Sequence, residues 1–184
     1  HTRNVIHRVH EHIILSALET SKADGILLSP VVGPKKPGDF LPGPIVKSYQ
    51  TMLESGLLPS DRVVLGSIHT YPRYAGPREA VFTALCRKNM GCSHFILGRD
   101  HTGVGTFYKT ERTRELFDQL GDLGIEPVFF EDIGYNARAR IYETIGSNKN
   151  EIKTISGTEA RNALRENRPL PDWYMRQNIQ NQLR

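Results

Sequence analysis

The sequence has 184 residues, of which 38% are hydrophobic and 24% charged, and its net charge is +4 at pH 7. This is an ordinary globular composition, and the length predicts one domain with a single core. Because the basic residues are scattered and not interleaved with aromatic residues, we expect no nucleic-acid partner. No stretch approaches the ~20 apolar residues of a membrane span, and two cysteines are too few for a disulfide framework. We therefore expect a cytoplasmic protein without membrane contact.

Short apolar runs alternate with amphipathic segments along the chain. This alternation predicts an α/β fold of the Rossmann-like type, a parallel sheet with helices on both faces, followed by a small C-terminal helical segment. Residues 1–150 would form the main α/β region, and residues 151–184 would continue it. In chain order, we expect a helix around 6–17, a strand at 25–29, a helix at 45–53, a strand at 63–67, a helix at 77–90, a strand at 94–98, a helix at 112–120 and a strand at 127–130.

The opening segment, His-Thr-Arg-Asn-Val-Ile-His-Arg-Val-His, contains two histidines at helical spacing. His7 and His10 would share one face of a first helical turn, beside Arg3 and Asn4. Unpaired N–H groups at a helix N-terminus attract anions, and these side chains add donors. Two partly exposed helix residues or half of a metal site are the alternatives, but the sequence lacks the further ligands that zinc needs. We expect an anion site and no protein-held metal.

This opening turn should itself follow a strand. We therefore expect a strand immediately before His1, and the absence of an initiator Met there suggests that the chain is part of a longer protein.

The expected strand at 94–98 ends in Gly98, and Arg99, Asp100, His101 and Gly103 follow it. Glycines with charged donors make a loop that a phosphate can approach closely. The loop is neither a Walker loop nor a dinucleotide fingerprint. The alternative is a solvent loop in which Asp and Arg pair with each other.

Three further segments could contact an anion. Residues 35–39 form a basic loop, and the segment 73–79 places Arg73 and Arg78 around a helix start, where a guanidinium could grip a tetrahedral oxyanion. Surface pairing of Arg78 and Glu79 is the alternative. Near the C-terminus, Ile155 and Ser156 lead through Gly and Thr into a helix, which is a phosphate contact or simply a helix cap.

Taken together, these motifs resemble the ATP sulfurylases, the sulfate adenylyltransferases. The similarity continues through the Pro-x-Trp-Tyr-Met-Arg stretch at 171–176. The motifs that follow the family's order are Thr2-Arg3-Asn4 with His7-Arg8-Val9-His10, Lys36-Pro37-Gly38-Asp39, Arg73-x-x-Gly76-x-Arg78-Glu79, Gly98-Arg99-Asp100-His101-x-Gly103 and Ile155-Ser156-Gly157-Thr158.

The resemblance implies a HUP-type nucleotidyltransferase catalytic domain without the family's N-terminal PUA-like domain and without its first strand. It implies that sulfate attacks the α-phosphorus of ATP, reversibly giving adenylyl sulfate and pyrophosphate, with Mg²⁺ accompanying the triphosphate. A homo-oligomer is expected from the same resemblance. By this resemblance, the catalytic residues are Thr2, Arg3, Asn4, His7, His10 and Arg73, the nucleotide-binding residues are His7, His10, Gly98, Arg99, Asp100, His101, Gly103, Ile155 and Ser156, and the sulfate-binding residues are His1, Arg3 and Arg73.

The chain departs from the family pattern at three positions. His1 stands where the family has a sulfate-site Gln, Val5 where Pro is usual and Thr102 where Ala is common. His1 adds a titratable group at the acceptor site. Two alternatives therefore stay open, a nucleotidyltransferase of this fold that acts on a different acid or alcohol, and a non-catalytic nucleotide-binding domain.

Overall fold

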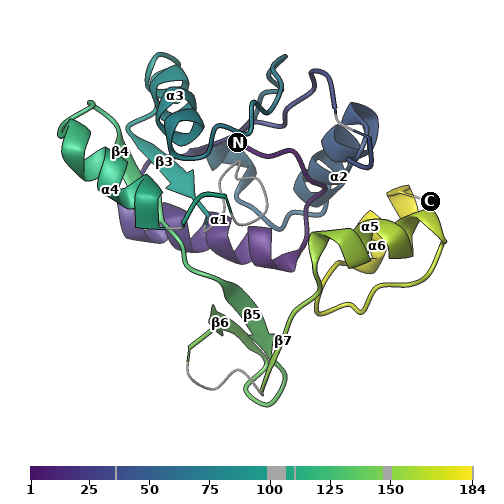
Figure 1. Ribbon diagram of the computed structural model, residues 1–184. Coiled ribbons are helices and arrows are strands. Elements are labelled where there is room, and N and C mark those ends of the chain that lie inside the picture. The colour runs from purple at the N-terminus through teal and green to yellow at the C-terminus, as the bar shows by residue number, and fades with distance from the viewer. Residues whose placement is uncertain (36, 99–106, 110, 147–150, 184) are drawn as a thin grey trace.

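The computed structural model describes residues 1–35, 37–98, 107–109, 111–146 and 151–183. Its elements follow the alternating order expected of an α/β protein (Figure 1). The helices are α1 (Arg8–Ser21), α2 (Pro42–Glu54), α3 (Pro77–Lys88), α4 (Glu111–Leu120), α5 (Gly157–Arg165) and α6 (Gln177–Leu183), with a 3-10 turn at Ser60–Arg62. The strands are β1 (Ile26–Leu28), β2 (Val63–Leu65), β3 (His94–Leu97), β4 (Glu126–Phe129), β5 (Ile133–Asn136), β6 (Ile141–Thr144) and β7 (Ile152–Lys153).

The first four strands confirm the predicted parallel pairing. β1 pairs with β2 in register Ile26 to Val63, and β3 pairs with β4 in register His94 to Glu126. Helices α2 and α4 make the two crossovers, as parallel strands require. All four predicted strands and all four predicted helices are present, with ends that differ by a few residues.

Among the described residues, the four strands form two separate pairs and not one continuous sheet. A cavity of about 630 Å³ lies between the pairs, and residues of all four strands line it together with His1 and the end of α1. The predicted strand before His1 stays a prediction.

Two apolar clusters hold the molecule together. The larger joins α1, α2, α5 and α6 around Tyr49, Met52 and Met175, all at most 2% exposed. The smaller packs α3 and α4 against β3 and β4 around Phe95 and Phe117. In Figure 1, α3 and α4 accordingly lie on one side of α1, and α2, α5 and α6 on the other.

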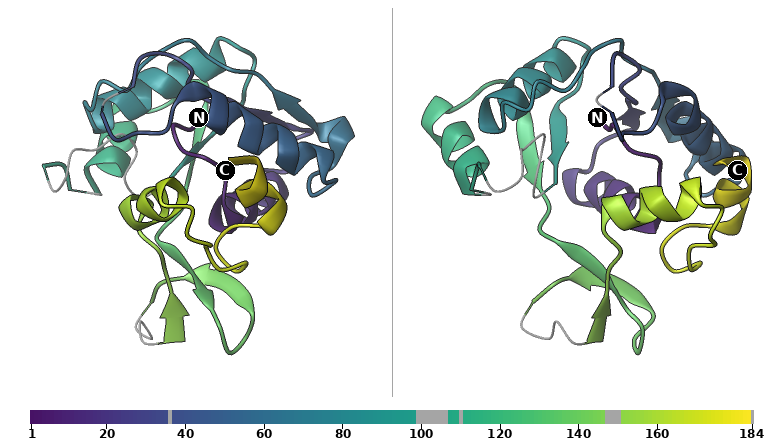
Figure 2. Two further views of the ribbon diagram at one scale, coloured as in Figure 1. Left: turned by 90° about the vertical axis from the view of Figure 1, so that its right-hand side faces the viewer. Right: turned by 45° about the vertical axis from the view of Figure 1, so that its right-hand side comes forward.

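A three-stranded antiparallel sheet, in the order β6-β5-β7, was not predicted. It projects from the rest of the molecule, as Figure 2 shows. Its strands mix polar and apolar residues and contain no continuous apolar run of the kind that predicted β1 to β4. Gly134 is required where β5 meets β7, because a Cβ there would lie 2.2 Å from the Ile152 side chain.

No helix in the described part of the chain has the length and apolar character needed to cross a membrane.

Candidate active site

The opening turn is fixed beyond the carboxyl end of β1. The Thr2 N–H donates to the Ser29 carbonyl at 3.2 Å, and the Val31 N–H donates to the Thr2 carbonyl at 2.8 Å. The Thr2 hydroxyl accepts from the Asn4 N–H at 3.2 Å, which closes the turn. Ligands of parallel α/β sheets bind at this end of the strands. The structure therefore brings Thr2, Arg3 and Asn4 to the edge at which we expected them.

His7 and His10, here called the histidine pair, begin helix α1. His7 is the N-cap residue, in extended conformation, and the two ring centroids are 3.8 Å apart. Nδ1 of His10 accepts the His7 N–H at 3.3 Å, so the proton of a neutral His10 belongs on Nε2. Nδ1 of His7 is buried and has no hydrogen-bond partner among the described residues.

Burial makes the histidine pair neutral near pH 7. The pKa of His10 is lowered to about 4, mainly by desolvation, with the nearby amino group of His1 as the second cause. Desolvation also lowers the pKa of His7 well below 6.5, with His10 as the second cause. At neutral pH these imidazoles can therefore donate N–H hydrogen bonds to an anion without carrying a charge.

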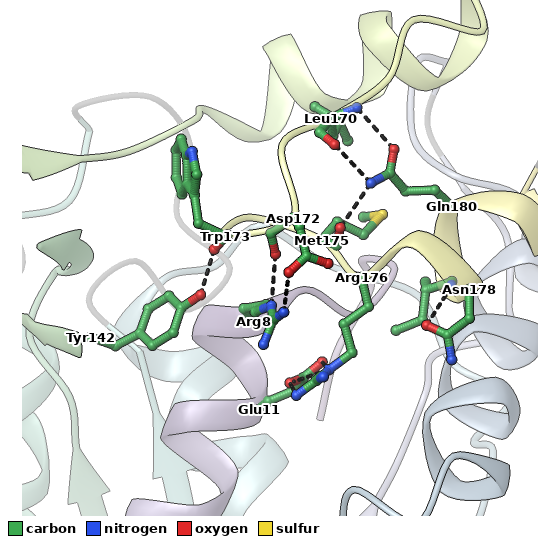
Figure 3. Close-up of polar contacts among 11 residues, drawn as sticks. Arg8, Glu11, Tyr142, Leu170, Asp172, Trp173, Met175, Arg176, Asn178 and Gln180 are labelled. Carbon is green, nitrogen blue, oxygen red and sulfur yellow. Dashed lines mark hydrogen bonds and ion pairs between the residues drawn. The ribbon is translucent and has the colours of Figure 1, made fainter. Parts of the chain in front are cut away.

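Residues 171–176, here called the C-terminal turn, pack onto the start of helix α1, which carries the histidine pair; Figure 3 shows the contacts of this turn with Arg8 and Glu11. The Tyr174 ring stacks on His7 with centroids 4.7 Å apart and planes inclined by 24°. The Tyr174 carbonyl accepts the Arg8 N–H at 2.9 Å, and the Arg8 side chain pairs with Asp172. One helical turn on, Arg176 pairs with the buried carboxylate of Glu11 at 2.9 Å.

Sequence reasoning missed these supports. In the sequence, the C-terminal turn contributed only to the family resemblance. In the structure it contacts α1, for example through Glu11 and Arg176, which are 165 residues apart. The pattern of a single sequence contains no signal for such a pairing. Glu11 lies between two histidines and Arg176 is followed by Gln177, so neither stands out in the sequence as a charge in an apolar segment.

Arg3, Lys35, Asp39 and Tyr74 form a second group, here called the arginine cluster. Nη1 of Arg3 lies 3.5 Å from Oδ1 of Asp39, whose side chain is 3% exposed. The Tyr74 hydroxyl donates to the other carboxylate oxygen at 3.3 Å, and the Arg3 guanidinium lies 5.6 Å from the Tyr74 ring centre. Burial lowers the pKa of Lys35, and Asp39 opposes that shift. Arg3 is a quarter exposed and so can still reach a ligand.

The segment 73–76 is fixed by a buried carboxylate. Glu79 accepts the Arg73 N–H through both oxygens, at 2.9 and 3.0 Å, and the Ala75 N–H at 3.1 Å. Tyr74 has a φ of 54°, and a Cβ on Gly76 would lie 2.4 Å from the Tyr108 ring. Because Glu79 is buried against the backbone, the surface-pairing alternative is wrong for it.

Two predicted sulfate ligands make contacts of a different kind. The Arg73 guanidinium lies against the rings of Tyr71 and Phe82, 4.6 and 4.8 Å from their centres. The His1 ring nitrogen Nδ1 lies 2.7 Å from a guanidinium nitrogen of Arg87, which is buried and also donates to Ser29. Their role toward sulfate stays a prediction.

The predicted nucleotide loop is only partly described. Gly98 directly follows β3 and is exposed, whereas Arg99, Asp100, His101 and Gly103 lie outside the described residues. Ser156 is the N-cap of α5 and accepts the Glu159 N–H at 3.1 Å, so the predicted helix cap is confirmed. Ile155 packs against the larger apolar cluster. Nucleotide contact by these residues stays a prediction.

Comparison with known proteins then decides the family. The sequence model described as ATP-sulfurylase matches residues 1–184. The chain belongs to the ATP-sulfurylase family. Among curated members, the sulfate adenylyltransferase of Synechococcus elongatus is 44% identical over 97% of this chain and 46% of its own length. That of Cenarchaeum symbiosum is 39% identical over 97% of this chain and 47% of its own length.

The chain thus spans about half the length of the curated relatives it matches. Among solved structures, one described as hexameric APS kinase from Thiobacillus denitrificans superposes with a TM-score of 0.74. Its sequence identity is 20%, and the match covers 99% of this chain and 34% of the other. At this identity the likeness concerns the fold, and it agrees with the α/β architecture of the ATP-sulfurylase family member described here.

Proposed function

We propose that this chain carries the adenylyl-transfer site of a sulfate adenylyltransferase, which converts ATP and sulfate into adenylyl sulfate and pyrophosphate, reversibly. One observation carries the proposal. In a chain that belongs to the ATP-sulfurylase family, the turn bearing Arg3 and Asn4 leads directly into the neutral His7 and His10 at the end of a parallel strand. Anion donors are therefore concentrated at the edge where such folds bind ligands.

In the proposed step, a sulfate oxygen attacks the α-phosphorus of ATP. The new bond joins that oxygen to phosphorus, and the bond to the pyrophosphate oxygen breaks, so pyrophosphate leaves with the electron pair. Sulfate is already ionised at neutral pH, and no protein base is needed. The protein has to hold two anions in line and to stabilise charge on the leaving phosphates.

The two ends of the site would divide this work. The histidine pair donates N–H groups to the phosphate chain without adding charge, which suits a buried position. Asn4 lies between the two ends in the sequence and would contact the reacting phosphate. The exposed part of Arg3 supplies a guanidinium to sulfate, with Arg73 and His1 proposed as further contacts. The loop at Gly98 and the turn at Ile155 and Ser156 would line the nucleotide.

We propose Mg²⁺ as the accompanying cation, carried on the triphosphate. The described residues offer no group of three His, Cys, Asp or Glu side chains that could hold a metal ion. The carboxylate of the arginine cluster, Asp39, is already committed to Arg3 and Tyr74. These residues fit an ion held by phosphate oxygens and water, which would neutralise phosphate charge when bound.

We further propose that the protein is a cytoplasmic homo-oligomer. Its two cysteines, Cys86 and Cys92, are free, which suits a reducing compartment. The structural neighbour from Thiobacillus denitrificans is described as hexameric, which supports self-association in this fold.

The test uses the full-length protein with ATP and Mg²⁺, with and without sulfate. The expected result is sulfate-dependent formation of adenylyl sulfate together with an equal amount of pyrophosphate. Pyrophosphate release that is indifferent to sulfate would instead support a different acceptor. ATP binding without turnover would support a non-catalytic nucleotide-binding role. Either result overturns the proposal.

A further inference from the structure

We propose that Tyr174 is a positioning residue for His7, holding the imidazole against His10 and keeping water away from it. This inference rests on the proposed function for its kinetic consequences but not for its structural ones. It assigns to the C-terminal turn a role in the site, although the turn lies more than 160 residues from the opening motif in the sequence.

Packing holds the His7 ring in place. Tyr174 stacks on one side at 4.7 Å, and His10 lies 3.8 Å away. Tyr174 is 5% exposed, so the stack is buried. Nδ1 of His7 makes no hydrogen bond among the described residues and only faces the His10 N–H in a capping-box arrangement, so hydrogen bonding at that atom contributes little to the ring orientation. The ring orientation therefore depends on its neighbours' surfaces, and Tyr174 is the larger of the two.

The C-terminal turn is anchored independently of any ligand. From α1, the Arg8 N–H binds the Tyr174 carbonyl, and the Arg8 side chain binds the Asp172 carbonyl at 2.7 Å. From α6, the buried Gln180 side chain binds the backbone of Leu170 and Met175 at 2.8 to 2.9 Å. Figure 3 shows the Arg8 side chain at Asp172 and the Gln180 side chain at Leu170 and Met175.

A hydrogen bond from the antiparallel sheet completes the anchor. The Tyr142 hydroxyl donates to the Trp173 carbonyl at 2.5 Å. Three elements far apart in the sequence thus fix the backbone that carries Tyr174, and a support of this kind is what a precisely oriented side chain requires.

The groups around the stacked rings of His7 and Tyr174 indicate how loss of the Tyr174 ring would change the His7 pKa. On one side, the His7 ring contacts His10, which itself lies near the amino group of His1. The Tyr174 side faces α5, where Arg161 and Glu159 have opposite effects on the Tyr174 pKa, while burial raises that pKa to about 12. Tyr174 is therefore uncharged at neutral pH and acts on His7 by excluding water. Without the ring, water would stabilise the imidazolium, and the His7 pKa would rise.

The first test is a nuclear magnetic resonance titration of the imidazole signals in the full-length protein, with His7 assigned through His7→Gln. We expect the His7 pKa to rise by about one unit or more toward 6.5 in Tyr174→Ala, and to stay near the wild-type value in Tyr174→Phe. Unchanged titration in Tyr174→Ala overturns the proposal. Should that variant not fold, Tyr174→Val takes its place, because it keeps part of the packing and still leaves room for water beside His7.

The second test is kinetic, and its matched control is Phe117→Ala. Phe117 is 5% exposed, like Tyr174, and packs on another aromatic ring, Phe129, at 6.0 Å, but in the smaller apolar cluster. We expect Tyr174→Ala to lower kcat roughly 10- to 100-fold and to move the acid limb of the pH–rate profile to higher pH, with Tyr174→Phe near wild type. Phe117→Ala should leave the limb in place. An equal shift in Phe117→Ala would show a general structural effect and overturn the proposal.

The two tests separate the inference from the proposed function. If the wild-type protein transfers no adenylyl group, the function fails, and the titration still decides whether Tyr174 controls His7. If transfer is normal but Tyr174→Ala matches wild type in both tests, only the inference fails.

Discussion

The histidine pair and the arginine cluster lie at the same strand edge, yet they present donors to an anion in opposite ways. His7 and His10 are buried and neutral, and they are supported by a segment from the far end of the chain. Arg3 is partly exposed and charged, and a carboxylate nearby partly offsets its charge. The histidine pair is shielded from water and positioned by packing (the dry end of the site), whereas the arginine cluster is partly solvated and positioned by ion pairing (the wet end).

This difference teaches how one site can hold two anions next to each other. Charge at both ends would bind the ground state of both ligands tightly without favouring the transition state. Neutral donors in a dry region strengthen as negative charge moves onto the leaving phosphates, because the local dielectric is low. The histidine pair should therefore govern kcat, and the arginine cluster should govern the KM for sulfate.

The largest expected effect is on kcat in His10→Asn. Asn can still accept the His7 N–H, but it has no donor at the position of Nε2. We expect kcat to fall about 10²- to 10³-fold, with little change in the KM for sulfate, measured by pyrophosphate release. His12→Asn, two residues beyond His10 and beside Tyr142, is the control and should change kcat less than about twofold. Equal losses in the two variants would contradict the comparison.

The next effect concerns the support under the histidine pair. Glu11→Gln removes the buried partner of Arg176, whose side chain is 28% exposed. Breaking such a pair leaves a cation poorly compensated, and we expect a loss of about 3 kcal/mol in the free energy of unfolding by urea. The exposed pair of Glu166 and Arg168 provides the control, because Glu166→Gln should cost less than about 1 kcal/mol. Similar losses in both would show that Glu11 is not a buried support.

A smaller effect is expected at the arginine cluster. Arg3→Ala removes charged hydrogen bonds to sulfate, and its KM for sulfate should rise roughly tenfold to a hundredfold, while kcat at saturation changes less. Arg114→Ala is the matched control, because Arg114 lies on α4 and packs on Phe129. If Arg3→Ala lowers kcat as strongly as His10→Asn does, the two ends do not divide the work.

Local sequence patterns predicted the α/β elements well and the long-range supports of the site poorly. The α/β elements up to residue 130 were predicted from apolar runs and helical spacing, and Ser156 from its capping position. The pairing of Glu11 with Arg176 and of His7 with Tyr174 depends on long-range packing, which leaves no periodic signal in one sequence. Strands β5 to β7 were missed because they contain no continuous apolar run, and residues 99–106 lie outside the described residues.

The smallest expected effect is on the pH dependence of the free energy of unfolding, and it follows from the burial of the histidine pair. A folded pKa of about 4 for His10, against 6.5 for an exposed histidine, means that the unfolded chain binds more protons between these values. Stability should therefore rise with pH from about 4 to 6.5 and be lost as the pH falls through that window, by about 1 kcal/mol per pH unit from His10. Urea unfolding of wild type and His10→Asn at several pH values measures this slope. Carboxylates titrate in both proteins and cancel in the difference, which therefore measures His10 together with its coupling to His7 and to the amino group of His1. Arg3→Ala should keep the wild-type slope because arginine stays charged throughout. If the free energy of unfolding depended on pH in the same way in wild type and His10→Asn, His10 would be solvated in the folded protein. The histidine pair would then not be the water-excluded part of the site.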